Sequence, residues 1–460
     1  MHSFHYRDGH LYCEGVDLTR IAREFGTPTY VYSAETILDH YARLDAALAS
    51  LDHLICYAVK ANSNRAILNL LVRAGAGFDI VSGGELFRVL AAGGDPAKCT
   101  FAGVGKSGEE IEYALEQSVY SFNVESEAEL ESIERIASAK KMRAPIALRV
   151  NPDVDPHTHQ YISTGSQENK FGIALDQVGT VYERAARMSN IEILGVQMHI
   201  GSQITEAKPF ASAIEKVTSL VRELKSKYGI EFLSVGGGMG IIYRRALESG
   251  SGKWWHDHGS EPSAFSLRDY ANAIVPPLRD LGIRIFVEPG RFLIGNAGVL
   301  LTRVRYIKQT GSKKFAIVDA GMNDLIRPAL YQSYHEIVPV IKPSTLTPTL
   351  SLEGRGGREA PGEGESVSLS HSKNKPGKID IVGPVCESGD FFALDRELPE
   401  VHEGDLLAIM SAGAYGFVMA SNYNSRPLPA EALVRGDKFA LIRKRQTWED
   451  LVRGEVEADW

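Results

Sequence analysis

The sequence is poor in cysteine, and its cysteines show no pairing. Only four occur in 460 residues, and none belongs to a Cys-x-x-Cys motif: Cys13, Cys56, Cys99 and Cys386. Closely spaced cysteines mark structural zinc sites, and dense disulfide frameworks belong to small secreted domains. The spacing favours neither, so we expect a reducing compartment in which each cysteine acts singly.

Long apolar runs and an excess of positive charge are also missing. The first ten residues are polar and no apolar run is long enough to span a bilayer, so we expect a cytoplasmic protein with no membrane association. Acidic residues outnumber basic ones by 58 to 50, which gives a formal net charge of -8. No basic stripe stands out, which argues against a nucleic-acid partner. Chemistry on a small molecule is the better expectation.

What the sequence does contain is a repeated alternation of short apolar runs and longer amphipathic segments. The runs lie at 53–59, 77–81, 98–103, 119–124, 145–150, 193–200, 231–236 and 284–288. Ser33 is expected to be the N-cap of a helix that precedes them, and Ser107 with Glu110 and Ser126 with Glu129 have the spacing of capping boxes. Eight such repeats predict a (β/α)8 barrel of parallel strands, with a doubly wound open sheet as the alternative.

Two further regions flank the repeats. Residues 1–32 predict short strands, and from Val299 onward strands recur without long helices. We therefore expect a barrel over 33–288 and a β-rich domain over 289–460 that the N-terminal strands join. The biased composition of 342–378 predicts a disordered insertion. A second unusual loop, 249–260, holds His256 and His258, but two histidines without further ligands predict no metal site.

The residues of chemical interest follow the ends of predicted strands. Lys60 follows the first strand in Tyr57-Ala58-Val59-Lys60-Ala61-Asn62. His199 ends the sixth, Gly236-Gly237-Gly238 the seventh and Glu288-Pro289-Gly290-Arg291 the eighth. The carboxyl ends of barrel strands share one face, where such barrels hold their active sites. A lysine that loses hydration there favours the free amine, a nucleophile for an aldehyde, although a strand-end lysine reaching solvent is the simpler interpretation.

The glycines near this lysine indicate a cofactor. Consecutive glycines let backbone N–H groups approach an anion, and the loops after strands seven and eight of a barrel commonly hold a phosphate. A phosphate site beside an amine that can form a Schiff base indicates pyridoxal 5′-phosphate. Glu288 would keep the pyridine nitrogen protonated and His199 would lie against the ring. An ion pair of Glu288 with Arg291, and a His199 that only fills the barrel mouth, are the alternatives.

Further motifs continue this series. They are Phe78-Asp79-Ile80-Val81-Ser82-Gly83-Gly84-Glu85, His199-Ile200-Gly201-Ser202-Gln203, Asp319-Ala320-Gly321-Met322-Asn323-Asp324, Arg327-Pro328-Ala329-Leu330-Tyr331, Gly383-Pro384-Val385-Cys386-Glu387-Ser388-Gly389-Asp390 and Ala412-Gly413-Ala414-Tyr415-Gly416. In this order they resemble the fold type III pyridoxal-phosphate decarboxylases, most closely the branch that acts on diaminopimelate. The resemblance covers nearly the whole chain except 249–260 and 342–378. It implies decarboxylation of meso-diaminopimelate to L-lysine and carbon dioxide, the last step of lysine biosynthesis.

The resemblance also implies which residues hold the cofactor. Lys60 carries it and His199 stacks on its ring. The remaining contacts, most of them around the phosphate, are implied for Ser202, Gly238, Glu288, Pro289, Gly290, Arg291 and Tyr415.

For the substrate, the resemblance implies a grip on the distal end by Arg291, Arg327, Tyr331 and Glu387, with Tyr415 close by. Cys386 reaches in from the partner subunit and protonates Cα after carbon dioxide leaves, so a homodimer with shared active sites is implied. Arg327 as a surface ion-pair partner and Cys386 as an inert thiol are the simpler alternatives.

The substrate can also be argued from charge. Two arginines suit a distal carboxylate, which each can meet with two hydrogen bonds, whereas a diamine precursor would call for acids. The first alternative is a related decarboxylase that acts on ornithine, arginine or carboxynorspermidine. The second is a racemase on the same barrel. A non-catalytic cofactor-binding homologue should have lost Lys60 or Cys386, and this chain keeps both.

Overall fold

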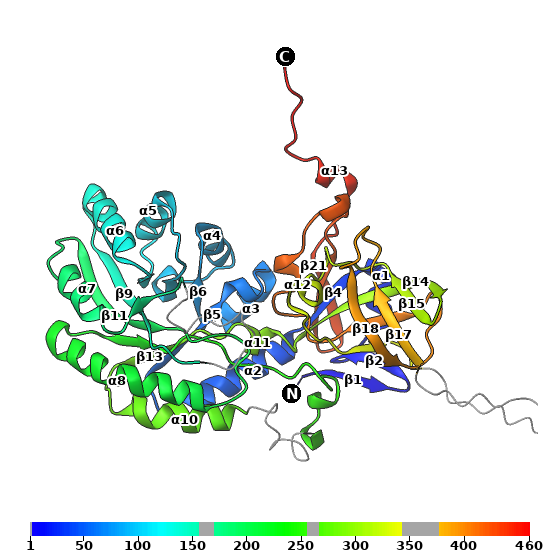
Figure 1. Ribbon diagram of the computed structural model, residues 1–460, viewed down its shortest axis with the longest axis horizontal. Helices are drawn as coiled ribbons and strands as arrows, with labels where there is room; N and C mark the ends of the chain where they lie inside the picture. Colours follow the sequence, from blue (N-terminus) through cyan, green and yellow to red (C-terminus); the bar gives the residue numbers. More distant parts are fainter. Residues whose placement is uncertain (1, 156–169, 255–265, 343–376) are drawn as a thin grey trace, which may run out of the picture.

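The computed structural model describes residues 2–155, 170–254, 266–342 and 377–460. Within them a barrel lies beside a strand-rich region (Figure 1). Almost all of the predicted insertion at 342–378 lies outside the described residues, as do His256 and His258 of the second unusual loop. Among the residues described, no helix has the length and apolar character needed to cross a membrane.

Eight parallel strands form the barrel. They are β5 (His53–Ala58), β6 (Gly77–Ile80), β7 (Cys99–Phe101), β8 (Ser121–Val124), β9 (Ala144–Asn151), β11 (Ile191–Met198), β12 (Phe232–Ser234) and β13 (Arg284–Val287). Each pairs with the next and β13 pairs back onto β5, which closes the sheet, while the short β10 (Ile173–Ala174) is added beside β9. The predicted barrel is confirmed, and the open-sheet alternative is wrong.

Helices surround the barrel in Figure 1. They are α3 (Arg65–Arg73), α4 (Gly83–Ala91), α5 (Gly108–Glu116), α6 (Glu127–Lys140), α7 (Val178–Ala185), α8 (Lys208–Tyr228) and α10 (Leu267–Arg279), with α2 (Ala34–Leu48) packed against α10. Ser33 caps α2 by accepting from the Thr36 N–H at 3.0 Å. The capping box of Ser107 and Glu110 is confirmed, with both of its hydrogen bonds present.

The second predicted capping box is only half formed. Ser126 does accept from the Glu129 N–H at 3.2 Å. The Glu129 carboxylate, however, pairs with the Lys106 ammonium at 2.5 Å and accepts from the Glu125 N–H at 2.9 Å. Because Lys106 is buried, its charge needs a partner more than the Ser126 N–H does, and the carboxylate goes to the ammonium.

The second region is built from strands. They are β14 (Gly298–Thr310), β15 (Lys313–Val318), β16 (Ile337–Pro339), β17 (Gly377–Val382), β18 (Phe391–Leu398), β19 (Leu406–Ile409), β20 (Ala430–Arg435) and β21 (Lys438–Arg443). From the N-terminal part of the chain, β4 (Thr29–Ser33) enters this sheet between β14 and β20. β1 (Phe4–Arg7), β2 (His10–Cys13) and β3 (Val16–Asp17) form a small separate sheet that shares a hydrophobic core with β14 and β20.

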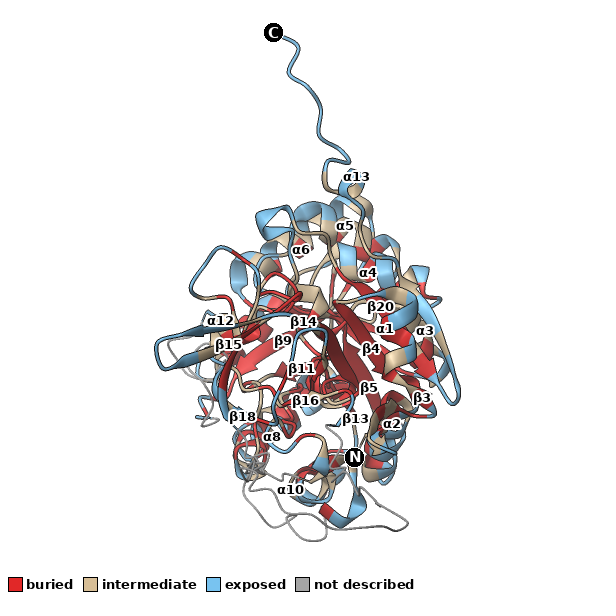
Figure 2. Cartoon of the chain, turned by 90° about the vertical axis from the view of Figure 1, so that its right-hand side faces the viewer, coloured by how far each residue is buried: buried red, intermediate tan, exposed pale blue. Residues whose placement is uncertain are grey.

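The two regions are joined by apolar packing. Buried residues follow the strands through the middle of the molecule in Figure 2. One continuous core contains Phe78 and Val287 of the barrel together with Leu300 and Ile409 of the strand-rich region. The carboxyl ends of the barrel strands therefore have a fixed position relative to the loops of the second region.

Candidate active site

Lys60 is oriented by the strand beside its own. It lies in η1 (Val59–Ala61), directly after β5, and its Nζ donates to Asp79 Oδ2 at 2.8 Å. Asp79 belongs to β6, where it pairs in register with Ala58, and it is completely buried. The amine is thereby held at the mouth of the barrel.

The electrostatic surroundings of Lys60 differ from the prediction. Burial lowers the pKa of the ammonium, as expected, but the Asp79 carboxylate, Tyr415 and Glu288 raise it, and the net pKa is above its usual value. The expectation that lost hydration alone would favour the free amine is therefore wrong. The sequence showed Asp79 within a motif but did not indicate that its carboxylate would pair with this lysine.

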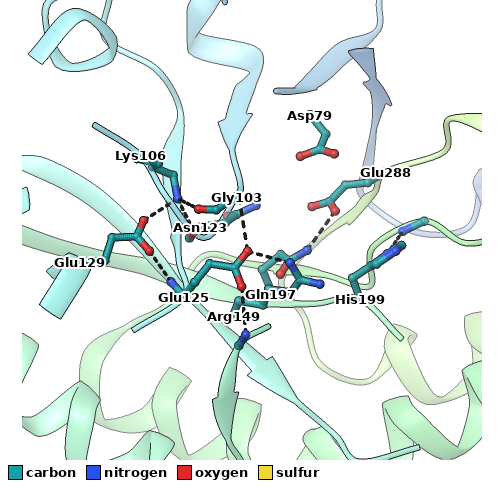
Figure 3. Close-up of polar contacts among 12 residues, drawn as sticks. Asp79, Gly103, Lys106, Asn123, Glu125, Glu129, Arg149, Gln197, His199 and Glu288 are labelled. Carbon is teal, nitrogen blue, oxygen red and sulfur yellow. Dashed lines mark hydrogen bonds and ion pairs between the residues drawn. The ribbon is translucent and has the colours of Figure 1, made fainter. Parts of the chain in front are cut away.

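Glu288 is buried at the end of β13 and is hydrogen-bonded on both oxygens. Ser234 Oγ donates to one at 2.6 Å. Gln197 Nε2 donates to the other at 3.0 Å (Figure 3). Burial raises the pKa of Glu288 to about 7, and the nearby charge of Asp79 contributes. Among the described residues no ion pair joins Glu288 to Arg291, so that alternative is wrong.

His199 follows β11 and is tied to the glycine segment. Its Nδ1 accepts from the Gly237 N–H at 3.2 Å (Figure 3). Burial lowers the pKa of His199 well below its usual value, and the charges of Arg149 and Lys60 act in the same direction. The ring is therefore a neutral imidazole with its proton on Nε2.

A buried ion pair that the sequence did not predict lies beside Gln197 and His199 (Figure 3). Arg149 Nη1 donates to Glu125 Oε1 at 2.7 Å, and the other Glu125 oxygen accepts from the Gly172 N–H at 2.9 Å. Both partners are almost fully buried. A buried charge needs a hydrogen-bonded partner of opposite charge. Glu125 is that partner for Arg149, and it holds in place the guanidinium whose charge lowers the pKa of His199.

The three glycines are required by backbone packing. A Cβ at Gly236 would lie 2.3 Å from the Met198 carbonyl oxygen, one at Gly237 2.1 Å from that of Glu288, and one at Gly238 2.4 Å from that of Gly201. No larger residue fits at these positions. The loops after β11, β12 and β13 consequently meet backbone to backbone, which suits a site for an anion.

Arg291 and Arg327 come together on one hydroxyl group. Nη1 of each donates to the Tyr243 hydroxyl at 2.6 Å. Nη2 of Arg291 donates to Ser202 Oγ at 3.1 Å, and Nη2 of Arg327 to Ser333 Oγ at 3.2 Å. Both arginines are buried, so the interpretation of Arg327 as a surface ion-pair partner is wrong. Tyr243 was missed because nothing near it in the sequence indicates its partners.

Tyr415 connects the second region to the lysine segment. Its N–H donates to the Ala61 carbonyl oxygen at 2.8 Å, and the Arg291 guanidinium lies 4.8 Å from the centre of its ring. Its φ of 56° is in the left-handed region. Tyr331 is half-buried at the end of α12 (Arg327–Tyr331), the short helix that begins with the second arginine.

Cys386 and Glu387 lie apart from this group. Both are exposed; the Cys386 N–H donates to Asn424 Oδ1 at 3.2 Å, and Glu387 Oε2 accepts from the Tyr423 hydroxyl at 2.9 Å. Within the described part of the chain, no hydrogen bond or ion pair links either residue to Lys60, Arg291 or Arg327. A single chain does not bring these two predicted residues to the barrel mouth.

The residues at the barrel mouth fit pyridoxal phosphate. A lysine is available for the aldehyde, a buried carboxyl for the ring nitrogen and a neutral imidazole for the ring face. Around the glycine segment there is no room for a Cβ, and Ser202 and the Gly290 backbone lie in the adjoining loops. The buried Asp79 Oδ1 and Gln197 Oε1 also have no hydrogen-bond partner within the protein, which leaves polar groups for a ligand or water.

Comparison with known proteins agrees with this geometry. Residues 34–295, more than half of the chain, match the family described as pyridoxal-dependent decarboxylase, pyridoxal binding domain. The chain is 50% identical over 456 residues to diaminopimelate decarboxylase of Pseudomonas aeruginosa, covering 99% of both. The structure of diaminopimelate decarboxylase from Helicobacter pylori complexed with L-lysine matches with a TM-score of 0.82 at 38% identity, covering 95% of this chain and 98% of that one. The one from M. jannaschii in co-complex with L-lysine matches with a TM-score of 0.84 at 35% identity, covering 99% and 98%. The chain therefore belongs to the pyridoxal-dependent decarboxylases and, within them, to the diaminopimelate decarboxylase family.

Proposed function

We infer that this chain is a carboxy-lyase that uses pyridoxal phosphate to convert meso-diaminopimelate into L-lysine and carbon dioxide. The observation that carries this inference is the pair of buried arginines that converge on Tyr243, one of them against the Tyr415 ring. Two guanidinium groups suit the distal carboxylate of diaminopimelate. Ornithine has no such carboxylate, and a site for it would need acidic side chains instead.

The residues around Lys60 have separate tasks in this reaction. Bound pyridoxal phosphate supplies an electron sink for the electron pair left at Cα when the carboxylate departs. Lys60 would hold the cofactor through its amine, which Asp79 orients. Glu288 keeps a proton on the ring nitrogen, and the hydrogen bonds from Ser234 and Gln197 orient its carboxyl. The neutral His199 ring supports the cofactor ring without placing a positive charge against it.

The anionic end of the cofactor is assigned to the glycine loops. Gly238, Pro289, Gly290 and the Arg291 backbone would surround the phosphate, with the Ser202 hydroxyl as a side-chain donor. Arg291 would therefore serve both ligands, since its backbone lies in the phosphate loop and its guanidinium points to Ser202 and Tyr243. Tyr331 and Tyr415 would line the substrate beside it.

Cys386 is proposed to protonate Cα from the partner subunit of a homodimer, with Glu387 beside it to accept from the distal ammonium. The exposure of Cys386 supports a role in the partner's site. An acid that served the site of its own chain would be expected among the buried residues there. The Glu387 carboxylate is presented at the surface by its hydrogen bond from Tyr423. Each complete site would then contain residues of two chains.

We further propose that the chain divides into the N-terminal strands at 1–32, a cofactor-binding barrel at 33–288 and a β-rich domain at 289–460. A cytoplasmic location is proposed as well. Four free cysteines, three of them buried, suit a reducing compartment.

The test of this function is carbon dioxide release by the purified protein with pyridoxal phosphate. We expect release from meso-diaminopimelate, with L-lysine as product, and none from L-ornithine or L-arginine. Release from ornithine or arginine instead would favour the related decarboxylases. A protein that binds the cofactor yet releases nothing from all three would support a non-catalytic homologue.

A further inference from the structure

Tyr243 occupies an unusual position between two buried cations. It lies in the loop that follows the three glycines, and its hydroxyl accepts from both Arg291 and Arg327 at 2.6 Å. The guanidinium carbons lie 6.0 and 5.2 Å from the centre of its ring. One oxygen atom and one aromatic ring are thus shared by two side chains of the same charge.

This arrangement offsets a repulsion. Two guanidinium groups in a poorly solvated site repel each other, and each must find an acceptor. Burial raises the pKa of Tyr243, but the charges of Arg291 and Arg327 outweigh it and lower the pKa below its usual value. The direction shows that both arginines interact favourably with negative charge at this oxygen.

The ring of Tyr243 is itself held in place. His335 packs against it edge to face, with centroids 5.3 Å apart and an interplanar angle of 81°. His335 Nδ1 lies 2.9 Å from the Met410 carbonyl oxygen, and burial lowers the pKa of the imidazole to about 3, so it adds no third positive charge. The oxygen shared by the arginines therefore has a fixed position.

The arginines still have hydrogen-bonding capacity to spare. Arg291 uses Nη1 for Tyr243 and Nη2 for Ser202, and its buried Nε has no hydrogen-bond partner within the protein. A buried N–H without a partner costs free energy unless a ligand satisfies it. A carboxylate placed against this guanidinium would supply that acceptor.

We propose that Tyr243 is a positioning residue that holds Arg291 and Arg327 together as one clamp for the distal carboxylate of the substrate, and that it thereby selects substrates with this group over those that end in an ammonium. This inference rests on the proposed function, because it concerns the same site. Without the hydroxyl the two guanidinium groups lose their common acceptor and separate, and a carboxylate then meets only one of them well.

The test compares two tyrosine variants of the holoenzyme. Tyr243→Phe keeps the ring and removes only the shared acceptor. Tyr334→Phe is the matched control, since Tyr334 also has two arginines over its ring, Arg244 at 4.2 Å and Arg396 at 4.1 Å, but none of the clamp residues. Calorimetry measures the affinity of each protein for L-lysine, which carries the carboxylate, and for cadaverine, which lacks it.

For Tyr243→Phe we expect L-lysine binding to weaken by about tenfold or more, the scale of a lost hydrogen bond to a charged group, with cadaverine binding unchanged. The KM for meso-diaminopimelate should rise by a similar factor while kcat and the visible absorbance of the bound cofactor stay as in the wild type. Tyr334→Phe should behave as the wild type throughout.

Several outcomes would overturn the clamp. One is that Tyr243→Phe binds L-lysine with wild-type affinity. Another is that the variant loses affinity for lysine and cadaverine equally, or loses the bound cofactor, which would show a merely structural role. A wild type that binds lysine no better than cadaverine would overturn it as well. If the wild type binds lysine through its carboxylate but releases no carbon dioxide from diaminopimelate, the proposed function fails and the clamp stands.

Discussion

Lys60 Nζ lies 2.8 Å from Asp79 Oδ2. Asp79 belongs to β6 and Lys60 to the short turn of helix directly after β5, and the register of these neighbouring strands places Ala58 opposite Asp79. The carboxylate is completely buried, so its charge acts on the amine with little screening by water. Burial alone would lower the pKa of Lys60, but the Asp79 carboxylate raises it. The residue expected to be a ready nucleophile is therefore a stabilised ammonium whose proton must be removed or transferred before it can react.

Replacing Asp79 by Asn should lower the pKa of Lys60. The pKa is raised in the wild type, and the neutral amide removes the charge that raises it while the burial that lowers it remains. We expect the pH at which the apoprotein captures pyridoxal phosphate half-maximally to fall by about one unit or more. Cofactor capture followed by absorbance across a pH series measures this. Asp39→Asn, which removes an exposed carboxylate on α2, should leave the profile unchanged; an unshifted Asp79→Asn profile would remove Asp79 from this role.

Replacing Lys60 by Ala should abolish the visible absorbance of the bound cofactor and the release of carbon dioxide, because it removes the amine that Asp79 holds at the barrel mouth. Spectra of the purified variant after addition of pyridoxal phosphate measure the first effect. Lys140→Ala, at the end of α6 where the lysine pairs with Glu116 of α5, is the control and should keep the wild-type spectrum. A wild-type spectrum in the Lys60 variant would refute the assignment.

The barrel could be predicted from the sequence because its strands are buried on both faces and therefore appear as continuous apolar runs. Strands β18 and β20 could not be predicted in this way, because they lack such runs. In β18 Leu394 is exposed and charged residues follow it, so no run is visible. β20 reads Ala-Glu-Ala-Leu-Val-Arg, which has the composition of a helix. Its Glu431 is buried because Arg443 pairs with its carboxylate and because Tyr32 and Asn64 donate to it from distant segments.

The site divides in the same way. Lys60, His199, the glycines and Glu288 could be found because each lies at the end of a predicted strand or directly after it. Tyr243 could not, because its importance comes from arginines 48 and 84 positions away along the chain. Contacts between side chains far apart in the sequence leave no local pattern. The sequence alone therefore indicates the residues that react or bind the cofactor more readily than the residues that hold them in position.

Glu288 is expected to cost the apoprotein stability at alkaline pH. Its pKa is raised from 4.5 to about 7, so the folded state holds a proton that the unfolded chain releases between these values, and stability falls as the pH rises through this interval. Glu288→Gln should therefore make the apoprotein more stable at pH 8 by about 3 kcal/mol, and this gain should vanish near pH 4.5. Thermal unfolding across the pH range measures it.

The same variant should lose activity. A neutral amide cannot hold the proton on the ring nitrogen, so kcat should fall by about a hundredfold or more even though the protein is more stable. Gain of stability at pH 8 with wild-type kcat would contradict the role of Glu288 as a partner of the cofactor, and a variant without a pH-dependent stability change would contradict its raised pKa.

Cys386→Ala tests both the proton donor and its location. The variant should retain cofactor binding, and its kcat should fall by about a hundredfold or more, the scale of a positioned acid. If Cys386 acts across a homodimer, mixing Lys60→Ala with Cys386→Ala under conditions that exchange subunits restores activity. A mixed dimer then has one site with the lysine of one chain and the cysteine of the other. Equal mixing should recover about a quarter of wild-type activity, since half of the dimers are mixed and each has one complete site of two. If each site uses the cysteine of its own chain, no dimer contains a complete site, and mixing restores nothing.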